Sequence, residues 1–180
     1  MTEPFERIDS RTAWEGRVAT VRVDRFRYAD GEQVEREIVA VPGAVGVVAY
    51  DDERVWLVRQ PREAVDDPAL LEVPAGKLDV DGESPLDSGR RELAEEVGLE
   101  ADDWRELFTF FTSPGFTDER FALFAATGLR HVDPRPDEGE RIEIVTWPLA
   151  RLDDAIAGCH DSKSLIGLLW LRHELARAAR

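Results

Sequence analysis

Apolar and polar residues alternate along the first part of the chain. Residues 18–28 (VATVRVDRFRY) keep a period of two, and a second alternating run covers Glu35–Val41. Asp30-Gly31 lies between the two runs. Two alternating runs around an Asp-Gly turn are typical of a β-hairpin, so the first 40 residues are expected to be rich in strands.

A change of period marks the first helix. From Ser84 to Val97 the apolar residues recur at helical spacing. Ser84 and Asp87 resemble a capping box, and Pro85 occupies the first helical position. Gly98 is a suitable stop signal. The pattern therefore predicts one capped amphipathic helix in the middle of the chain.

The rest of the chain alternates strand-like runs with two further helical stretches. Strands are expected at 43–50, 54–59, 70–73, 104–112, 120–126 and 141–147, and helices at 149–157 and 162–178. With 180 residues and 43% hydrophobic content, the chain can bury one sizeable core. We therefore expect an α+β protein of the αβα-sandwich type, built on a mixed sheet with about three helices.

Composition and charge exclude several classes of protein. The net charge of −15 and the absence of a Lys/Arg run argue against a nucleic-acid partner. No apolar stretch is long enough for a membrane span, and the N-terminus lacks the features of a signal peptide, so we expect a cytoplasmic protein without a membrane partner. The single cysteine, Cys159, receives no role.

The acidic surplus is spread along the chain, and only two lysines occur, Lys77 and Lys163. Such a surface is typical of adaptation to high salt, where screening weakens self-repulsion. A GC-rich genome would also replace Lys by Arg, so both explanations stay open.

Three glutamates lie close together on the predicted helix. Glu92, Glu95 and Glu96 stand at positions i, i+3 and i+4, which are neighbours on one helical face. Like charges at this spacing repel, and Arg91 pairs with Glu95 while Arg90 can approach the same group. Divalent cations such as Mg²⁺ or Mn²⁺ would neutralise the cluster, since both prefer oxygen ligands. An ordinary solvated helix with Arg–Glu pairs is the alternative.

The flanking residues resemble the Nudix box, G-x(5)-E-x(7)-R-E-U-x-E-E-x-G-U, where U is aliphatic. Its positions are matched in order by Gly76, Glu83, Arg91, Glu92, Leu93, Glu95, Glu96, Gly98 and Leu99. The one departure is the spacer after Gly76, where KLDVDG supplies six residues instead of five. We expect the extra residue to bulge from the loop before the helix and to leave the metal-binding half in register.

The resemblance implies a Nudix fold and hydrolysis of a nucleoside diphosphate linked to another group. It implies that Glu92 and Glu96 are the main ligands of Mg²⁺, with Mn²⁺ a substitute. Glu95 is expected near the ions or tied to Arg91, which orients the carboxylates. The carbonyl of Ala75 completes the implied metal site.

Further segments resemble the ADP-ribose pyrophosphatase subfamily. Pro114 lies 114 − 99 = 15 positions after Leu99, a spacing typical of that subfamily. The resemblance assigns substrate contacts to four residues of this loop: Ser113, Pro114, Gly115 and Glu119. A plain Ser-Pro-Gly turn is the alternative.

Two other places are expected to contact the nucleotide. Arg62 follows a strand in the segment Gln60-Pro61-Arg62, and its planar fork suits a diphosphate. The resemblance also suggests that Arg36 and Glu37 help form the nucleotide site of a partner subunit in a swapped homodimer. They would otherwise be ordinary exposed strand residues. Residues 1–40 would then be an N-terminal β-hairpin extension of a Nudix domain covering 41–180.

An acidic loop between two predicted strands supplies the expected base. Matching it to the family places the general base at Glu138 and a further metal ligand at Glu140, although the two assignments are interchangeable. A glycine, Gly139, gives the loop freedom to close. A solvated acidic loop without a catalytic role is the alternative.

ADP-ribose, cleaved to AMP and ribose 5-phosphate, is the expected substrate. Other nucleotide sugars such as GDP-mannose, dinucleoside polyphosphates and oxidised nucleotides are the nearest alternatives. A module that binds ADP-ribose without cleaving it belongs to a different class, and such modules usually lose box glutamates. The aromatic residue that stacks on the base is left open among Phe116, Trp14 and Tyr28.

Overall fold

The computed structural model describes residues 4–134 and 141–178. Its strands are β1 (Phe5–Glu15), β2 (Thr20–Tyr28), β3 (Gln33–Ala40), β4 (Ala44–Tyr50), β5 (Arg54–Arg62), β6 (Asp67–Glu72), β7 (Ala75–Lys77), β8 (Leu99–Phe111), β9 (Arg120–His131) and β10 (Glu143–Pro148). Its helices are α1 (Pro85–Val97), α2 (Leu152–Gly158) and α3 (Ser162–Ala178), with short 3₁₀ turns at Glu63–Val65 and Leu149–Arg151.

The chain forms two compact units. The first consists of Met1–Gly43 together with Phe111–Arg120, and the second of Ala44–Phe110 together with Phe121–Arg180. The sequence placed a boundary near residue 40 and did not separate the 111–120 loop from the second unit. This loop groups with the N-terminal sheet because its backbone pairs with β3.

The first unit is built on a three-stranded antiparallel sheet in the order β1-β2-β3. The predicted hairpin is confirmed as β2 and β3, and Gly31 adopts a φ of +90° in the turn. Strand β1 adds a third strand that the apolar pattern did not indicate, because ten of its eleven residues are exposed. The extension is therefore larger than a hairpin.

The only buried residue among the described residues of this unit is a carboxylate, Asp24. Ser10 Oγ donates to it at 2.6 Å, Arg22 Nε at 3.1 Å and Arg7 Nη1 at 3.3 Å. Burial by itself raises the pKa of Asp24, but these hydrogen bonds outweigh it and leave the pKa below its ordinary value. A polar network across β1 and β2 thus takes the place of an apolar centre.

The 111–120 loop is fixed to β3 by backbone and side-chain bonds. Val39 N donates to Phe116 O at 2.8 Å, and Thr117 Oγ1 donates to Val39 O at 2.8 Å. Asp118 accepts from Arg22 Nη2 at 3.0 Å and from Val41 N at 3.3 Å. Arg22 therefore connects the buried Asp24 of the sheet to the loop.

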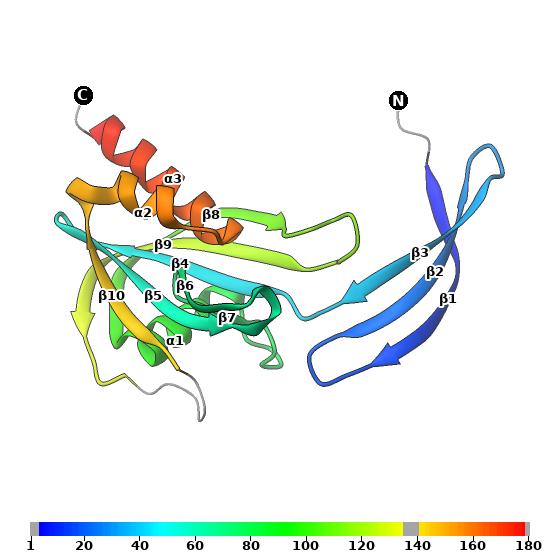
Figure 1. Ribbon diagram of the computed structural model, residues 1–180, viewed down its shortest axis with the longest axis horizontal. Helices are drawn as coiled ribbons and strands as arrows, with labels where there is room; N and C mark the ends of the chain where they lie inside the picture. The colour runs from blue at the N-terminus through cyan, green and yellow to red at the C-terminus, as the bar shows by residue number, and fades with distance from the viewer. Residues whose placement is uncertain (1–3, 135–140, 179–180) are drawn as a thin grey trace. The chain divides into compact units, whose positions relative to one another are not determined.

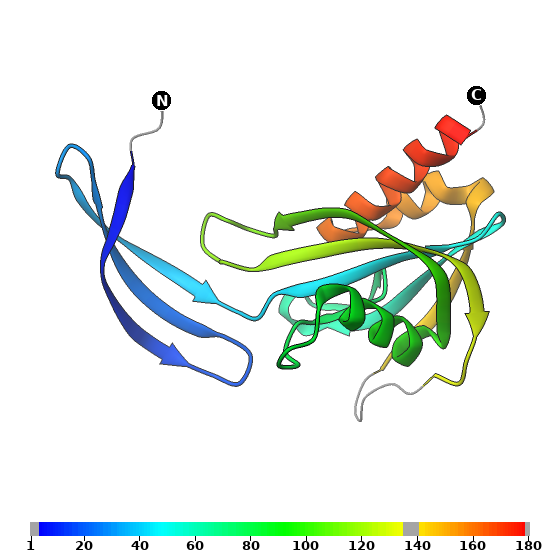
Figure 2. The same cartoon turned by 180° about the vertical axis from the view of Figure 1, so that it is seen from behind.

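The second unit is a mixed sheet between helices. Its main strand order is β10-β5-β4-β9-β8, with β6 paired to β5 and β7 paired to β4. Strands β4 and β9 run parallel, whereas β5 pairs antiparallel with β4, β6 and β10, and β7 pairs antiparallel with β4. Helices α2 and α3 cover one face, and α1 lies on the other (Figures 1 and 2). This arrangement confirms the expected α+β class and the αβα sandwich.

Strand β4 shows how the pleat fills both layers. Val47 and Ala49 pack in the cluster that contains the α1 residues, whereas Val48 packs with Leu168 of α3. All five residues from Val45 to Ala49 are buried. A side chain at Gly46 would collide with the ring of Phe121, with its Cβ 2.7 Å from Cζ. The continuous apolar run of β4 thus forms a central strand that is buried on both faces.

Within residues 4–134 and 141–178, no helix is long and apolar enough to cross a membrane.

We predict that Asp24→Asn lowers stability near neutral pH, because two arginines then face a neutral amide in place of a buried carboxylate. The loss should be about 2 kcal/mol, or about 4–8 °C in Tm. The folded-state pKa of Asp24 lies below its ordinary value of 3.8, so its contribution is present above pH 3.8 and is lost as the pH falls through the folded pKa. Thermal unfolding followed by circular dichroism from pH 7 to pH 3 measures both effects.

Asp9→Asn is the matched control, since Asp9 is an exposed carboxylate on the same sheet. Its Tm should stay within about 1 °C of the wild type. Equal Tm values for the wild type and Asp24→Asn at pH 7 would contradict the structural role given to Asp24.

Candidate functional site

Helix α1 forms as its sequence predicts and is held firmly at both ends. Ser84 Oγ accepts from Asp87 N at 3.1 Å, which confirms the predicted N-cap, and Gly98 ends the helix with a φ of +68°. Leu93 and Val97 bury one face against the sheet, and Gly89 allows close approach to Val45. The helix is thus a rigid support for its glutamates.

Arg91 lies at the centre of the carboxylates. Its Nε and Nη2 each donate to Glu83 at 3.1 Å, and its Nη1 donates to Glu92 at 2.8 Å and to Glu95 at 3.0 Å. The hydrogen bonds to Glu83 are the largest cause of the raised pKa of Arg91. The expected pairing of Arg91 with Glu95 is confirmed. Arg90, by contrast, bonds to Asp87 instead of the glutamate cluster.

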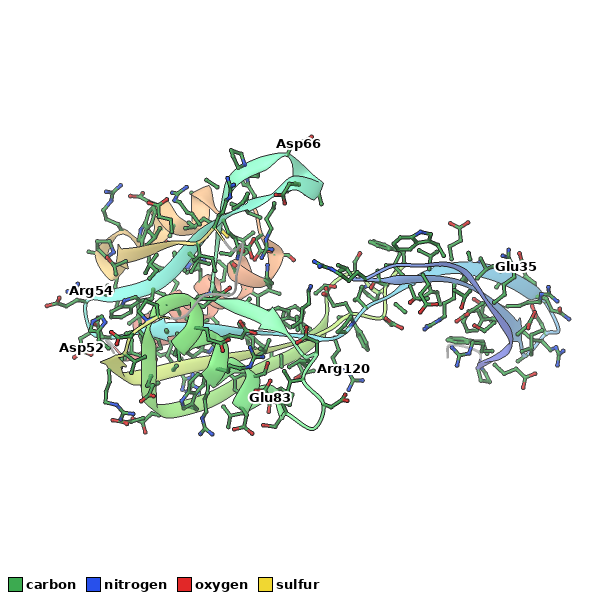
Figure 3. All side chains as sticks on the ribbon, turned by 90° about the horizontal axis from the view of Figure 1, so that it is seen from below. Glu35, Asp52, Arg54, Asp66, Glu83 and Arg120 are labelled. Carbon is green, nitrogen blue, oxygen red and sulfur yellow. The ribbon has the colours of Figure 1, made fainter. Side chains whose placement is uncertain are left out.

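The loop with the extra residue keeps Glu83 within reach of Arg91. Glu83, labelled in Figure 3, lies two residues before the start of α1. Glu83 N donates to Val80 O at 3.1 Å, and Gly82 between them has a φ of +80°. This tight turn accommodates the six-residue spacer. The ion pair between Glu83 and Arg91 is therefore made despite the longer loop.

Two box glutamates lie against the backbone of β7. Ala75 N donates to a carboxylate oxygen of Glu96 at 3.0 Å, and Glu96 is 5% exposed. Glu92 packs directly on Gly76, where an added Cβ would lie 1.9 Å from the carboxylate carbon. Gly76 is thus required by the space that Glu92 occupies. Any side chain at position 76 would displace this carboxylate.

The donor atoms of these residues suit a divalent cation. Glu92 and Glu96 supply hard oxygen atoms beside the backbone of Ala75, and the glycine at 76 leaves room for a carboxylate there. In the described part of the chain, no three Asp, Glu, His or Cys side chains form a metal-binding group by themselves. Glu138 and Glu140, the expected base and further ligand, lie outside the described residues.

Arg62 lies beside a buried carboxylate that the sequence analysis had not singled out. Its Nε and Nη2 donate to the two oxygens of Glu72 at 2.6 and 2.9 Å. Glu72 is fully buried and also accepts from Lys163 Nζ at 2.9 Å. Its position inside the apolar run from Leu71 to Val73 was the available signal, because a charge within such a run must find partners if it is buried.

The expected nucleotide contacts of the N-terminal unit share a pocket of about 410 Å³. Among the residues predicted from sequence, the pocket brings together Arg36, Glu37, Pro114 and Gly115. The residues that line it and that were not predicted as contacts include Phe5, Arg22, Phe26, Phe111 and Asp118.

Of the three aromatic candidates, Tyr28 and Phe116 line this pocket, whereas Trp14 does not. Trp14 instead lies over Gly16, where an added Cβ would meet its ring. Phe5 packs edge-on against Phe26 and Tyr28, with ring centroids 5.4 and 5.9 Å apart. The pocket therefore offers several aromatic rings beside charged groups.

Two predicted contacts of the 111–120 loop do not line the pocket. Ser113 O accepts from Phe116 N and Thr117 N, both at 3.1 Å, and so closes the turn at the loop. Glu119 accepts from Thr112 Oγ1 at 2.5 Å. In this structure both residues shape the loop.

Cys159 is buried, and its thiol donates to Leu71 O at 3.5 Å. Burial raises the pKa of this thiol, which keeps it protonated and poorly reactive. Cys159 therefore packs in the core as a small apolar side chain.

Comparison with known proteins places this geometry in a family. The NUDIX domain family model matches residues 41–166. A solved structure of an ADP compounds hydrolase has the same fold, with a TM-score of 0.88 and 24% identity, over 100% of this chain and 98% of that one.

Three curated relatives are similar over much of the chain. ADP-ribose pyrophosphatase from Mycobacterium tuberculosis is 45% identical over 134 residues, which cover 74% of this chain but 64% of that protein. Methanol dehydrogenase activator from Bacillus methanolicus is 35% identical over 92% of this chain and 91% of its own length. ADP-ribose pyrophosphatase from Bacillus subtilis is 33% identical over 96% of this chain and 95% of its own length. With the box residues assembled on α1 and β7, these matches show that the chain belongs to the NUDIX domain family.

Proposed function

We propose that this protein is a Nudix hydrolase that cleaves the diphosphate bond of ADP-ribose to AMP and ribose 5-phosphate with Mg²⁺. The observation that carries the proposal is the packing of Glu92 and Glu96 against the backbone of Ala75 and Gly76. Similarity to two curated ADP-ribose pyrophosphatases supports the choice of substrate. Mn²⁺ is the expected substitute metal.

In this proposal the residues of α1 and β7 would bind the metal ion. Glu92 and Glu96 are its main ligands, with Glu95 at its edge and the carbonyl of Ala75 as a further donor. Arg91 holds the side chains of Glu92 and Glu95 in place through its hydrogen bonds. When bound, the cation offsets the charge of the diphosphate and stabilises the leaving phosphate.

Proton transfer in the proposal is assigned to the loop outside the described residues. Glu138 takes a proton from the attacking water as the general base, and Glu140 is a further metal ligand. This assignment stays a prediction from the sequence. Arg62 contacts the diphosphate through its guanidinium group in this proposal.

The pocket of the N-terminal unit supports recognition of the nucleoside. Tyr28 and Phe116 offer rings for stacking on a base, while Arg36 and Glu37 supply polar contacts. Its volume of about 410 Å³ lies in the range of small-ligand pockets. We assign to this pocket the adenosine part of a substrate that is bound by the Nudix domain of a partner subunit.

We also propose a homodimer in which residues 1–40 serve the nucleotide site of the partner subunit, while residues 41–180 form the Nudix domain. A three-stranded sheet needs an apolar face or a covering element for stability. The described residues of the first unit bury only Asp24. A second copy would supply the missing cover.

Replacing Glu96 by Gln should lower kcat for ADP-ribose by about 10³-fold, because a charged metal ligand is lost. The amide oxygen can still accept from Ala75 N, so Tm should change little. Product chromatography after incubation with Mg²⁺ or EDTA measures turnover. ADP-ribose, GDP-mannose, NADH and diadenosine polyphosphates form the substrate panel, at low and high KCl.

Glu100→Gln is the matched control and should keep wild-type turnover, since Glu100 pairs with Arg130 on the surface. AMP and ribose 5-phosphate should appear fastest from ADP-ribose and only with metal. Faster cleavage of another compound would reject the proposed substrate. Near-normal kcat in Glu96→Gln would reject the ligand assignment, and no cleavage in any condition would favour a binding module.

The swapped dimer predicts complementation between two inactive variants. A mixture of Glu96→Gln with Arg36→Ala/Glu37→Ala should regain about a quarter of the wild-type activity, because each mixed dimer then contains one intact site. Refolding the variants together at equal concentration, followed by an ADP-ribose assay, measures this recovery. The separately refolded variants are the controls. No recovery despite a dimer mass in light scattering would exclude the shared site.

A further inference from the structure

Glu72 is a fully buried carboxylate that does not belong to the Nudix box. It ends β6 and is surrounded by an apolar run. A buried carboxylate without partners would be costly, so its hydrogen bonds decide where it can point. Arg62 occupies both carboxylate oxygens, and Lys163 shares one of them. Glu72 is therefore held by two cations from different elements.

The contact with Glu72 fixes the plane of the Arg62 guanidinium. Two parallel N–H donors from one guanidinium to one carboxylate leave little rotational freedom. The side chain of Arg62 is 40% exposed, whereas that of Glu72 is fully buried. One edge of the guanidinium is thus anchored in the interior while the residue reaches the surface. The hydrogen bonds to Glu72 are the largest cause of the raised pKa of Arg62.

The same segment is fixed from the other side by the start of α3. Val73 N donates to Ser164 Oγ at 2.8 Å, and Lys163 Nζ bonds to Asp161 at 2.7 Å as well as to Glu72. Two residues beyond Val73, Ala75 N donates to Glu96. The segment from Glu72 to Ala75 therefore joins the α3 contacts to the hydrogen bond with Glu96.

We infer that Glu72 is a positioning residue, which holds Arg62 in the orientation needed to bind a diphosphate. Glu72 itself does not touch the substrate in this account. The inference rests on the proposed function, in which Arg62 contacts the diphosphate. Lys163 balances the remaining charge and stabilises the fold without setting the plane of the guanidinium.

Inorganic diphosphate is the probe that tests this role separately from the nucleoside. Its Kd in the presence of Mg²⁺ is measured by calorimetry for the wild type, Glu72→Gln, Arg62→Gln and the double variant. Each single substitution should weaken binding about tenfold, the loss of one oriented charge-assisted contact. The double variant should bind no more weakly than Arg62→Gln, because Glu72 acts only through Arg62. In the ADP-ribose assay, Glu72→Gln should raise KM about tenfold and change kcat less than threefold.

Lys163→Met is the matched control, because it removes a partner of Glu72 and leaves the two bonds to Arg62. It should lower Tm and keep the Kd for inorganic diphosphate within about twofold. Arg62→Lys keeps the charge but loses the fork, and should weaken binding as much as Arg62→Gln does. If Glu72→Gln does not fold, Glu72→Asp replaces it, since its shorter side chain keeps the charge but cannot reach both donors.

The outcomes separate this inference from the proposed substrate. Wild-type affinity in a folded Glu72 variant, or an additive loss in the double variant, would overturn the positioning role. An equal loss of affinity in Lys163→Met would also overturn it, and so would a wild type that binds no inorganic diphosphate. If ADP-ribose is not cleaved but the diphosphate affinities follow the expected pattern, the proposed substrate fails and the positioning role stands.

Discussion

The rest of the structure depends on how the charges of α1 are held against a packed sheet. Glu92, Glu95 and Glu96 repel one another, and burial of the helix increases the cost of leaving them uncompensated. Arg91 offsets part of this repulsion by bonding to two of them and to Glu83. The arrangement is stable because Leu93 and Val97 of the same helix pack into the core.

The two units compensate buried charge in different ways. In the second unit, apolar clusters on both faces of the sheet provide the core, and Glu72 is compensated by Arg62 and Lys163. In the first unit, Asp24 and its donors occupy the centre where apolar side chains would normally lie. The second unit therefore has an apolar core, whereas a polar network occupies the centre of the first.

Local sequence patterns predicted the elements that depend on local physics. Helix α1 was predictable from its cap and periodicity, and β2 with β3 from alternation around Gly31. Strand β1 was missed because its exposed residues leave no apolar period, and β7 because three residues are too few to show one. Such strands are defined by pairing with strands elsewhere in the chain, and a local stretch of sequence does not show that pairing.

The same division applies to the candidate site. The spacing of the box predicted which glutamates share one face of α1, and the structure adds that Glu92 lies on Gly76. The partner of Arg62 could not be predicted, because Glu72 meets Arg62 and Lys163 only after β5, β6 and α3 have packed. Residues distant in sequence thus decide how a predicted contact is oriented.

The most direct test of the account is cleavage of ADP-ribose in ¹⁸O-labelled water with Mg²⁺, followed by ³¹P NMR and mass spectrometry. The account predicts AMP and ribose 5-phosphate, with one ¹⁸O atom in the phosphate of one product, because water attacks a phosphorus of the diphosphate. Label in a sugar hydroxyl group, or products in which the diphosphate remains intact, would contradict it.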